Sequence, residues 1–149
     1  MIRKAKPSDI PAIVEIAIES VSINPLPVQI NKEAIQDMLE TCINPAHFLW
    51  VIEDKGEVVG AFCALAQRSF WFKGLQASVL LYYTRKPGEG IKLFKEFARW
   101  CKSRSGIKLA VFELEPESDP KLEKYLARLG FNRKSANMSY VRGQGESNV

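Results

Sequence analysis

The chain has 149 residues, of which 46% are hydrophobic and 26% are charged, a composition typical of a single globular domain. Lys and Arg number 21 against 17 Asp and Glu, so the formal net charge is +4 at pH 7. This composition excludes general disorder, and the mild positive charge favours an anionic ligand. The basic residues are spread along the chain, so nucleic acid is not the expected partner.

Cysteine and histidine are too sparse to build a metal site or a histidine-based catalytic triad. The chain has three cysteines, Cys42, Cys63 and Cys101, without CxxC spacing, and its single histidine is His47. Apolar runs are too short to cross a membrane, and the first residues lack the apolar core of a secretory signal. We therefore expect a cytoplasmic protein that has no metal and no membrane span.

The N-terminal part is predicted to form one strand and two helices. Residues 1–5 are typical of a short strand, and apolar residues at helical spacing over 10–21 predict a helix with Ser8 as its N-cap. Two prolines make residues 20–31 a loop. Asn31 is the expected N-cap of the second helix.

Three strands are expected in the middle of the chain. Residues 48–53 and 58–67 are strand-like and are separated by Asp54-Lys55-Gly56, which predicts an antiparallel hairpin. The chain turns again over 67–74. A third strand is predicted over 75–84, which is β-branched, aromatic and nearly uncharged.

A helix and a parallel strand are expected to follow. Apolar residues recur at i, i+3, i+4 spacing from Ile91 to Cys101, and Gly106 is placed to end this helix at C′. Residues 107–114 are predicted to form a buried strand. Because a helix connects it to strand 75–84, the two strands should be parallel.

The C-terminal part is predicted to contain one more helix and a closing strand region. Asp119 can cap this helix and Gly130 can end it, after which 131–142 should form one or two strands. Residues 1–142 are then one domain and 143–149 a flexible tail. The predicted order, β-α-α-β-β-β-α-β-α-β, defines an α/β fold with a mixed sheet.

The segment with the most chemical information is Arg85-Lys86-Pro87-Gly88-Glu89-Gly90, between a predicted strand and a predicted helix. Unpaired backbone N–H groups and the positive end of the helix dipole meet at such a junction, which is a favourable site for phosphate. Neither GxxxxGK[ST] nor GxGxxG is present, so the common nucleotide-binding loops are excluded.

The pattern Arg-x-x-Gly-x-Gly resembles the [Arg/Gln]-x-x-Gly-x-[Gly/Ala] loop of the GNAT superfamily of acyl-CoA-dependent N-acyltransferases. The opening IRKAKPSDIPAIVEI, the hairpin WVIEDKGEVVGAFCAL and the closing KLEKYLARLGF are similar to that family in the same order. The resemblance implies a GNAT fold with acetyl-CoA as co-substrate and an amine acceptor as partner. It implies acetyl transfer to a primary amine of a small molecule or protein, by direct attack in a ternary complex.

The resemblance also implies where coenzyme A would bind. The loop backbone from Lys86 to Ile91 would hold the pyrophosphate, and a backbone N–H near Leu81 or Tyr82 would polarise the thioester carbonyl. Pro87 has no N–H to contribute. The implied cofactor-binding residues are Leu81, Tyr82, Tyr83, Arg85, Lys86, Gly88, Glu89, Gly90 and Ile91.

The catalytic residues are less well marked, because the family's usual acidic tyrosine aligns with Leu126 and strand 75–84 carries no carboxylate. Tyr125, one position earlier, would project about 100° away from that direction. The candidates for proton transfer are Tyr83, Tyr140 and Glu113, with Glu115 and Glu19 as further carboxylates.

Two alternatives to an enzyme remain open. One is a non-catalytic CoA-binding module of the same fold, which Leu126 and the carboxylate-free strand would suit. The other is a small basic nucleic-acid-binding domain that uses residues 68–73, RSFWFK, where three aromatic residues lie between two cations. The same segment could instead line an acceptor site, form a homodimer contact or simply fold onto the domain.

Overall fold

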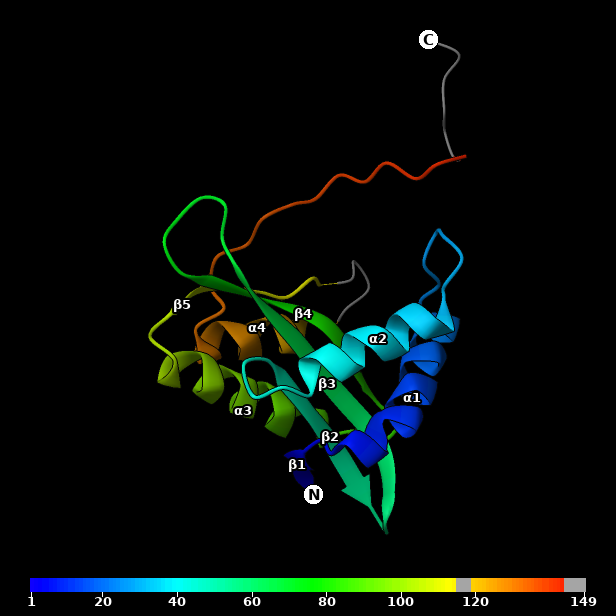
Figure 1. Cartoon of the computed structure of the whole chain (residues 1–149). Coiled ribbons are helices and arrows are strands. Elements are labelled where there is room, and N and C mark those ends of the chain that lie inside the picture. The colour runs from blue at the N-terminus through cyan, green and yellow to red at the C-terminus, as the bar shows by residue number, and fades with distance from the viewer. Residues whose placement is uncertain (115–118, 144–149) are drawn as a thin grey trace.

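The computed structural model describes residues 1–114 and 119–143 (Figure 1). In chain order the elements are β1 (Ile2–Lys4), the 3₁₀ turn η1 (Pro7–Asp9), α1 (Ile10–Ile23), α2 (Lys32–Cys42), β2 (Phe48–Asp54), β3 (Glu57–Arg68), β4 (Leu75–Thr84), α3 (Gly90–Ser103), β5 (Ile107–Val111) and α4 (Pro120–Leu129). The strands form one sheet in the order β1-β2-β3-β4-β5. All neighbouring pairs are antiparallel except β4 and β5, which are parallel as the helical crossover predicts.

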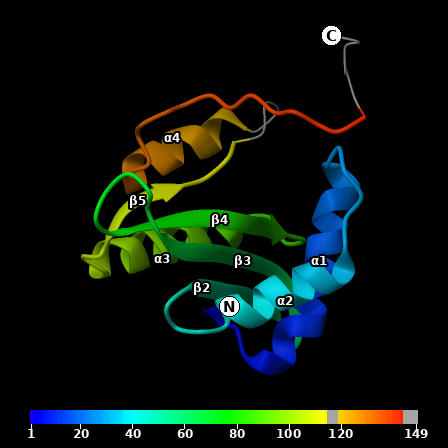
Figure 2. The ribbon, with the colours of Figure 1, turned by 45° about the horizontal axis from the view of Figure 1, so that its top comes forward.

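Two hydrophobic cores lie on opposite faces of this sheet. Helices α1 and α2 cover one face, and α3 and α4 cover the other (Figures 1 and 2). Strand β3 supplies both cores because successive side chains of a strand point to opposite faces. Ala61 and Cys63 join the α1/α2 core, whereas Phe62 and Ala64 join the α3/α4 core.

Several local predictions are confirmed. The hairpin turns at Lys55 and Gly56, which have positive φ values of 53° and 82°. Asn31 caps α2 by accepting a hydrogen bond from the backbone N–H of Ala34 at 3.0 Å. Gly130 ends α4 with φ 111°.

Two predicted helix ends are wrong. Ser8 lies in η1 and does not cap α1, because the chain makes a 3₁₀ turn before the helix begins. Gly106 is not the C′ residue of α3, which ends at Ser103 with Arg104 as its C-cap. The Gly106 carbonyl instead accepts a hydrogen bond from the backbone N–H of Leu75, at the point where β4 begins.

The predicted closing strands over 131–142 are also wrong. No strand is present in this segment, and residues 132–140 are all exposed. β5 is shorter and less buried than predicted, since it covers 107–111 and Leu109 and Val111 are partly exposed. A strand-like pattern does not produce a strand without a partner to bond its backbone. Of the predicted tail, residues 144–149 lie outside the described part of the chain.

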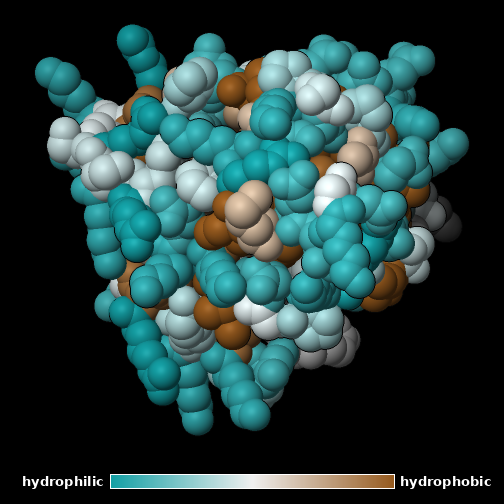
Figure 3. Space-filling view, turned by 90° about the horizontal axis from the view of Figure 1, so that it is seen from below, coloured by the Kyte–Doolittle hydropathy of each residue, from teal (hydrophilic) through white to brown (hydrophobic). Residues whose placement is uncertain are grey.

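The surface seen from below is mostly hydrophilic, with apolar residues in small separate groups (Figure 3). None of the helices in the described residues has the length and hydrophobicity that a membrane crossing requires.

Candidate functional site

The site begins where β4 and β5 separate. Their pairing ends at Ser78 and Val111, although β4 continues to Thr84. On the other side of β4, Cys63 pairs with Leu81 and Ala64 pairs with Val79, so the intervening residue of β4 is a β-bulge. Beyond Ser78, the edge of β4 that faces β5 therefore has no strand partner in the described residues.

The loop after β4 leads directly into α3, and its two glycines are required for different reasons. Gly88 has φ 91°, a conformation that other residues rarely adopt, but a Cβ there would meet no atom within 4 Å. Gly90 is the first residue of α3, and a Cβ there would collide with the hydroxyl of Tyr82. The glycines thus allow the turn and bring the helix N-terminus against β4.

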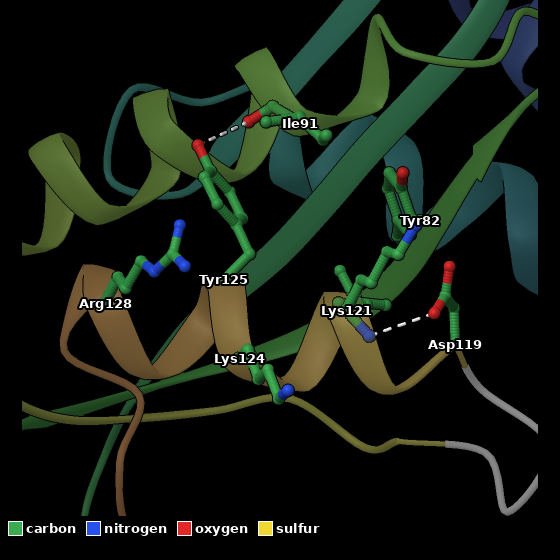
Figure 4. A pocket seen from close by; sticks show the side chains of 8 residues that line it. Tyr82, Ile91, Asp119, Lys121, Lys124, Tyr125 and Arg128 are labelled. Atoms are coloured by element: carbon green, nitrogen blue, oxygen red, sulfur yellow. Dashed lines mark hydrogen bonds between the residues drawn. The ribbon is translucent and has the colours of Figure 1, made fainter.

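A pocket of about 530 Å³ lies between this helix N-terminus, β4 and α4 (Figure 4). Five of its residues come from α4, and three of these five are cations, which makes the wall from α4 positively charged. The lining consists of Tyr82, Ile91, Asp119, Lys121, Leu122, Lys124, Tyr125 and Arg128.

Local contacts place α4 against this pocket. Asp119 caps the helix by accepting a hydrogen bond from the backbone N–H of Lys121 at 2.9 Å. The Tyr125 hydroxyl donates to the carbonyl of Ile91 at 3.3 Å, which joins α4 to the first turn of α3 (Figure 4). Leu126 is only 3% exposed and packs in the core. Of the neighbours Tyr125 and Leu126, the residue that faces the pocket is therefore Tyr125.

The cations of the loop itself are paired elsewhere. Nε of Arg85 lies 2.8 Å from Oε2 of Glu19 on α1, and Nζ of Lys86 lies 3.2 Å from Oδ1 of Asp54. The positive charge that lines the pocket therefore comes from α4, not from these two side chains.

Glu89 places a carboxylate beside the start of α3. Its Oε1 lies 3.3 Å from Nζ of Lys92, and its Oε2 lies 3.9 Å from the amino group of Met1. The Oε2 atom is buried and has no hydrogen-bond partner. Two nearby cations thus partly offset the negative charge that Glu89 brings to the loop.

The two adjacent tyrosines of β4 face opposite sides of the sheet. Tyr82 belongs to the α3/α4 core and lines the pocket, and burial raises the pKa of its phenol. Tyr83 packs against the α1/α2 core. Its pKa is raised by desolvation and by the charge and hydrogen bond of Glu19, and Arg85 opposes that rise. Both phenols are therefore protonated at neutral pH.

The candidate catalytic residues lie on three different segments. Tyr83 faces α1, and Glu113 follows β5, where it accepts a hydrogen bond from Nδ2 of Asn137 at 3.0 Å. Tyr140 lies in the irregular C-terminal segment and is 68% exposed. Glu115 lies outside the described residues. Among those described, no group of three or more His, Cys, Asp or Glu is arranged to hold a metal ion.

Sequence reasoning missed the basic face of α4. Lys121, Lys124 and Arg128 are three and four residues apart and so share one face of a helix, next to Tyr125. Applying helical spacing to charged residues, and not only to apolar ones, would have indicated this face. That the face lines a pocket depends on contacts between segments far apart in the sequence.

Comparison with known proteins gives structural matches only. No protein-family model and no curated protein sequence matches the chain. A predicted acetyltransferase from Clostridium acetobutylicum, solved with acetyl-CoA, is 16% identical with a TM-score of 0.74, and the match covers 95% of each chain. Glucosamine-6-phosphate N-acetyltransferase from Arabidopsis thaliana is 18% identical with a TM-score of 0.67, over 95% of this chain and 97% of that one.

A third similar structure is an aminoglycoside acetyltransferase from an uncultured soil metagenomic sample, solved with sisomicin. It is 12% identical with a TM-score of 0.65, and the match covers 95% of this chain and 93% of that chain. These matches extend over nearly the whole chain, and they agree with the predicted α/β class and mixed sheet. The chain therefore has the fold of the GNAT acetyltransferases.

Proposed function

We propose that this protein is an N-acetyltransferase that transfers the acetyl group of acetyl-CoA to a primary amine of a small molecule or a protein. The observation that carries this proposal is the pocket at the separation of β4 and β5, where a helix N-terminus meets three cations of α4. The GNAT fold and the acetyltransferases that share it support the proposal.

The residues of the pocket suit a phosphate-bearing thioester such as acetyl-CoA. Lys121, Lys124 and Arg128 supply positive charge, and the first turn of α3 adds the positive end of its dipole. The volume of about 530 Å³ lies within the usual range for small-molecule sites. Tyr82 gives the pocket an aromatic wall.

The edge of β4 that has no strand partner among the described residues offers backbone N–H groups for catalysis of the transfer. Backbone N–H groups along residues 79–84 are fixed by the pairing of β4 with β3, and donors on the free edge can stabilise negative charge on a carbonyl oxygen. In the reaction, the amine attacks the thioester carbonyl carbon, an amide bond forms and the C–S bond breaks. Holding the two reactants together supplies a large part of the acceleration in such transfers.

The acceptor side is proposed to lie beside the α1–α2 loop. Leu26 and Val28 of this loop are exposed, which suits an acceptor with an apolar portion near its amine. The likeness to glucosamine-6-phosphate and aminoglycoside acetyltransferases is consistent with a small-molecule amine.

The test is release of free coenzyme A thiol from acetyl-CoA in the presence of a panel of amines. The panel should contain amino sugars, aminoglycosides, polyamines, arylalkylamines and lysine-containing peptides. We expect release that depends on one class of amine, with mass spectrometry showing an acetylated product. Binding of acetyl-CoA without transfer to any amine would favour the non-catalytic CoA-binding module. Absence of acetyl-CoA binding would contradict the proposal itself.

A further inference from the structure

The loop between β3 and β4 carries two large aromatic side chains into solvent. Phe70 is 88% exposed and Trp71 is 85% exposed. Their rings contact each other edge to face, with centroids 4.9 Å apart. The loop extends beyond the neighbouring strands and helices in the view of Figure 1. Two such residues together on a protruding tip are unusual for a surface that meets only water.

Backbone contacts hold this loop in a defined shape. The N–H of Ser69 donates to the carbonyl of Gly74 at 3.1 Å, which closes the loop at its base. The N–H of Trp71 donates to Oγ of Ser69 at 3.0 Å. Phe72, by contrast, is partly buried. The fold therefore presents two of the three aromatic residues outward and turns the third toward the domain.

Three cations lie at or near the base of the loop, and acidic residues are absent from this part of the sequence. Arg68 and Lys73 flank the aromatic residues, and the side chain of Lys108 lies against the backbone at Gly74. Neither residues 58–88 nor residues 97–112 contain an Asp or Glu. An anionic partner would meet little repulsion here.

We propose that this tip binds the surface of an anionic lipid membrane. Phe70 and Trp71 would enter the headgroup region, where aromatic side chains are favoured, and the three cations would lie against lipid phosphates. The convex shape favours a lipid surface over single-stranded nucleic acid, which usually stacks its bases along a groove. This mode of binding needs no membrane-spanning helix.

The first experiment is co-sedimentation of the full chain with vesicles, without acetyl-CoA. We expect binding to vesicles of phosphatidylcholine and phosphatidylglycerol in equal amounts, weak binding to pure phosphatidylcholine, and a decrease with added salt. Phe70→Ser combined with Trp71→Ser should reduce binding by about tenfold or more. Arg68→Gln combined with Lys73→Gln should reduce it by about fivefold for each cation. Met138→Ser, which removes another fully exposed apolar residue, should leave binding unchanged.

A second experiment locates the contact in the bound state. The chain has three tryptophans, and quenching of tryptophan emission by brominated lipid should be lost in Trp71→Phe, in which vesicle binding itself is largely kept. Failure to bind anionic vesicles would overturn the proposal. The proposal would also be overturned if the tip bound a single-stranded oligonucleotide through Trp71 and did not bind vesicles. Self-association that the Phe70→Ser/Trp71→Ser variant abolishes would overturn it as well. None of these outcomes depends on whether the protein is an acetyltransferase.

Discussion

At the scale of single residues, the loop between β4 and α3 shows why a sequence motif and its physical cause must be separated. The chain has glycine at both 88 and 90, and the sequence gives no sign that the reasons for the two glycines differ. At Gly88 the reason is a positive φ, and at Gly90 it is the close approach of Tyr82. Only the folded chain, which brings β4 and α3 together, reveals the second reason.

Because the reasons differ, replacing each glycine by alanine should destabilise the fold by a different amount. Gly90→Ala should lower the free energy of unfolding by about 1–3 kcal/mol, because the added methyl group must displace the Tyr82 ring or the helix N-terminus. Gly88→Ala should cost only about 1 kcal/mol, since backbone conformation is its sole penalty. Urea unfolding of both variants measures this, and a larger loss for Gly88→Ala would contradict the stated reasons.

A second prediction concerns Asp9, which is almost fully buried. Its carboxylate accepts hydrogen bonds from Nη1 and Nη2 of Arg3 at 2.8 and 3.1 Å, and from the backbone N–H of Lys6 at 2.7 Å. The bonds from Arg3, followed by the bond from Lys6, outweigh burial and hold the pKa of Asp9 below its ordinary value. Asp9→Asn should therefore cost about 1.5–3 kcal/mol at neutral pH.

The pH dependence of this cost follows from the direction of the shift. A carboxyl whose pKa is lowered in the folded state stabilises the fold above its unfolded pKa of about 3.9. That contribution is lost as pH falls from there through the folded pKa. The difference in unfolding free energy between the natural chain and Asp9→Asn should thus shrink below about pH 4. A constant difference would show that Asp9 acts through its shape and not through its charge.

At the scale of elements, most of the fold was predictable from the sequence. Strand β4 was predicted with its observed bounds, because an uncharged β-branched run is bounded by a glycine and by the Arg85-Lys86-Pro87-Gly88 break. Asn31 and Asp119 cap the helices that they were expected to cap. The failed prediction over 131–142 has a different origin, since a strand depends on a partner that local pattern does not specify.

Two substitutions of Asp119 separate the stability that its cap gives α4 from the negative charge that it brings to the pocket. Asp119 both caps this helix and lines the pocket. Asp119→Ala should destabilise the protein by about 1 kcal/mol because the cap is lost, whereas Asp119→Ser keeps a capping oxygen and should retain nearly all of the stability. The serine variant should bind acetyl-CoA at least as well as the natural chain, because a negative charge is gone. Thermal unfolding and titration calorimetry measure these effects, and equal stabilities of the two variants would argue against the cap.

At the scale of the whole molecule, the hydrophobic cores on the two faces of the sheet hold in place the strands and helices that form the site. Phe62 is fully buried and contacts Phe48 and Phe94 edge to face, with ring centroids 5.4 and 5.1 Å apart. Phe62→Ala should cost about 3–5 kcal/mol. The matched change Phe70→Ala, on the exposed tip, should alter the unfolding free energy by less than about 0.5 kcal/mol. Denaturant unfolding of both variants tests this contrast, and similar losses would show that the tip packs on the domain.

The site itself was only partly predictable from the sequence. The strand, the glycine loop and the helix were found because they are contiguous along the chain. The pocket could not be predicted, because it requires β4 and β5 to separate and α4 to lie against the first turn of α3. The charge of Lys121, Lys124 and Arg128 acquires a function only through that arrangement.

The most direct test of the account is calorimetric titration of acetyl-CoA into the natural chain and into two variants of equal net charge. One variant is Lys121→Gln/Lys124→Gln/Arg128→Gln, and the other, Lys32→Gln/Lys95→Gln/Arg133→Gln, removes three cations that do not line the pocket. We predict micromolar binding by the natural chain, a loss of at least about tenfold in the pocket variant, and near-natural affinity in the control. No binding by the natural chain, or equal affinity in both variants, would contradict the assignment of this pocket to acetyl-CoA.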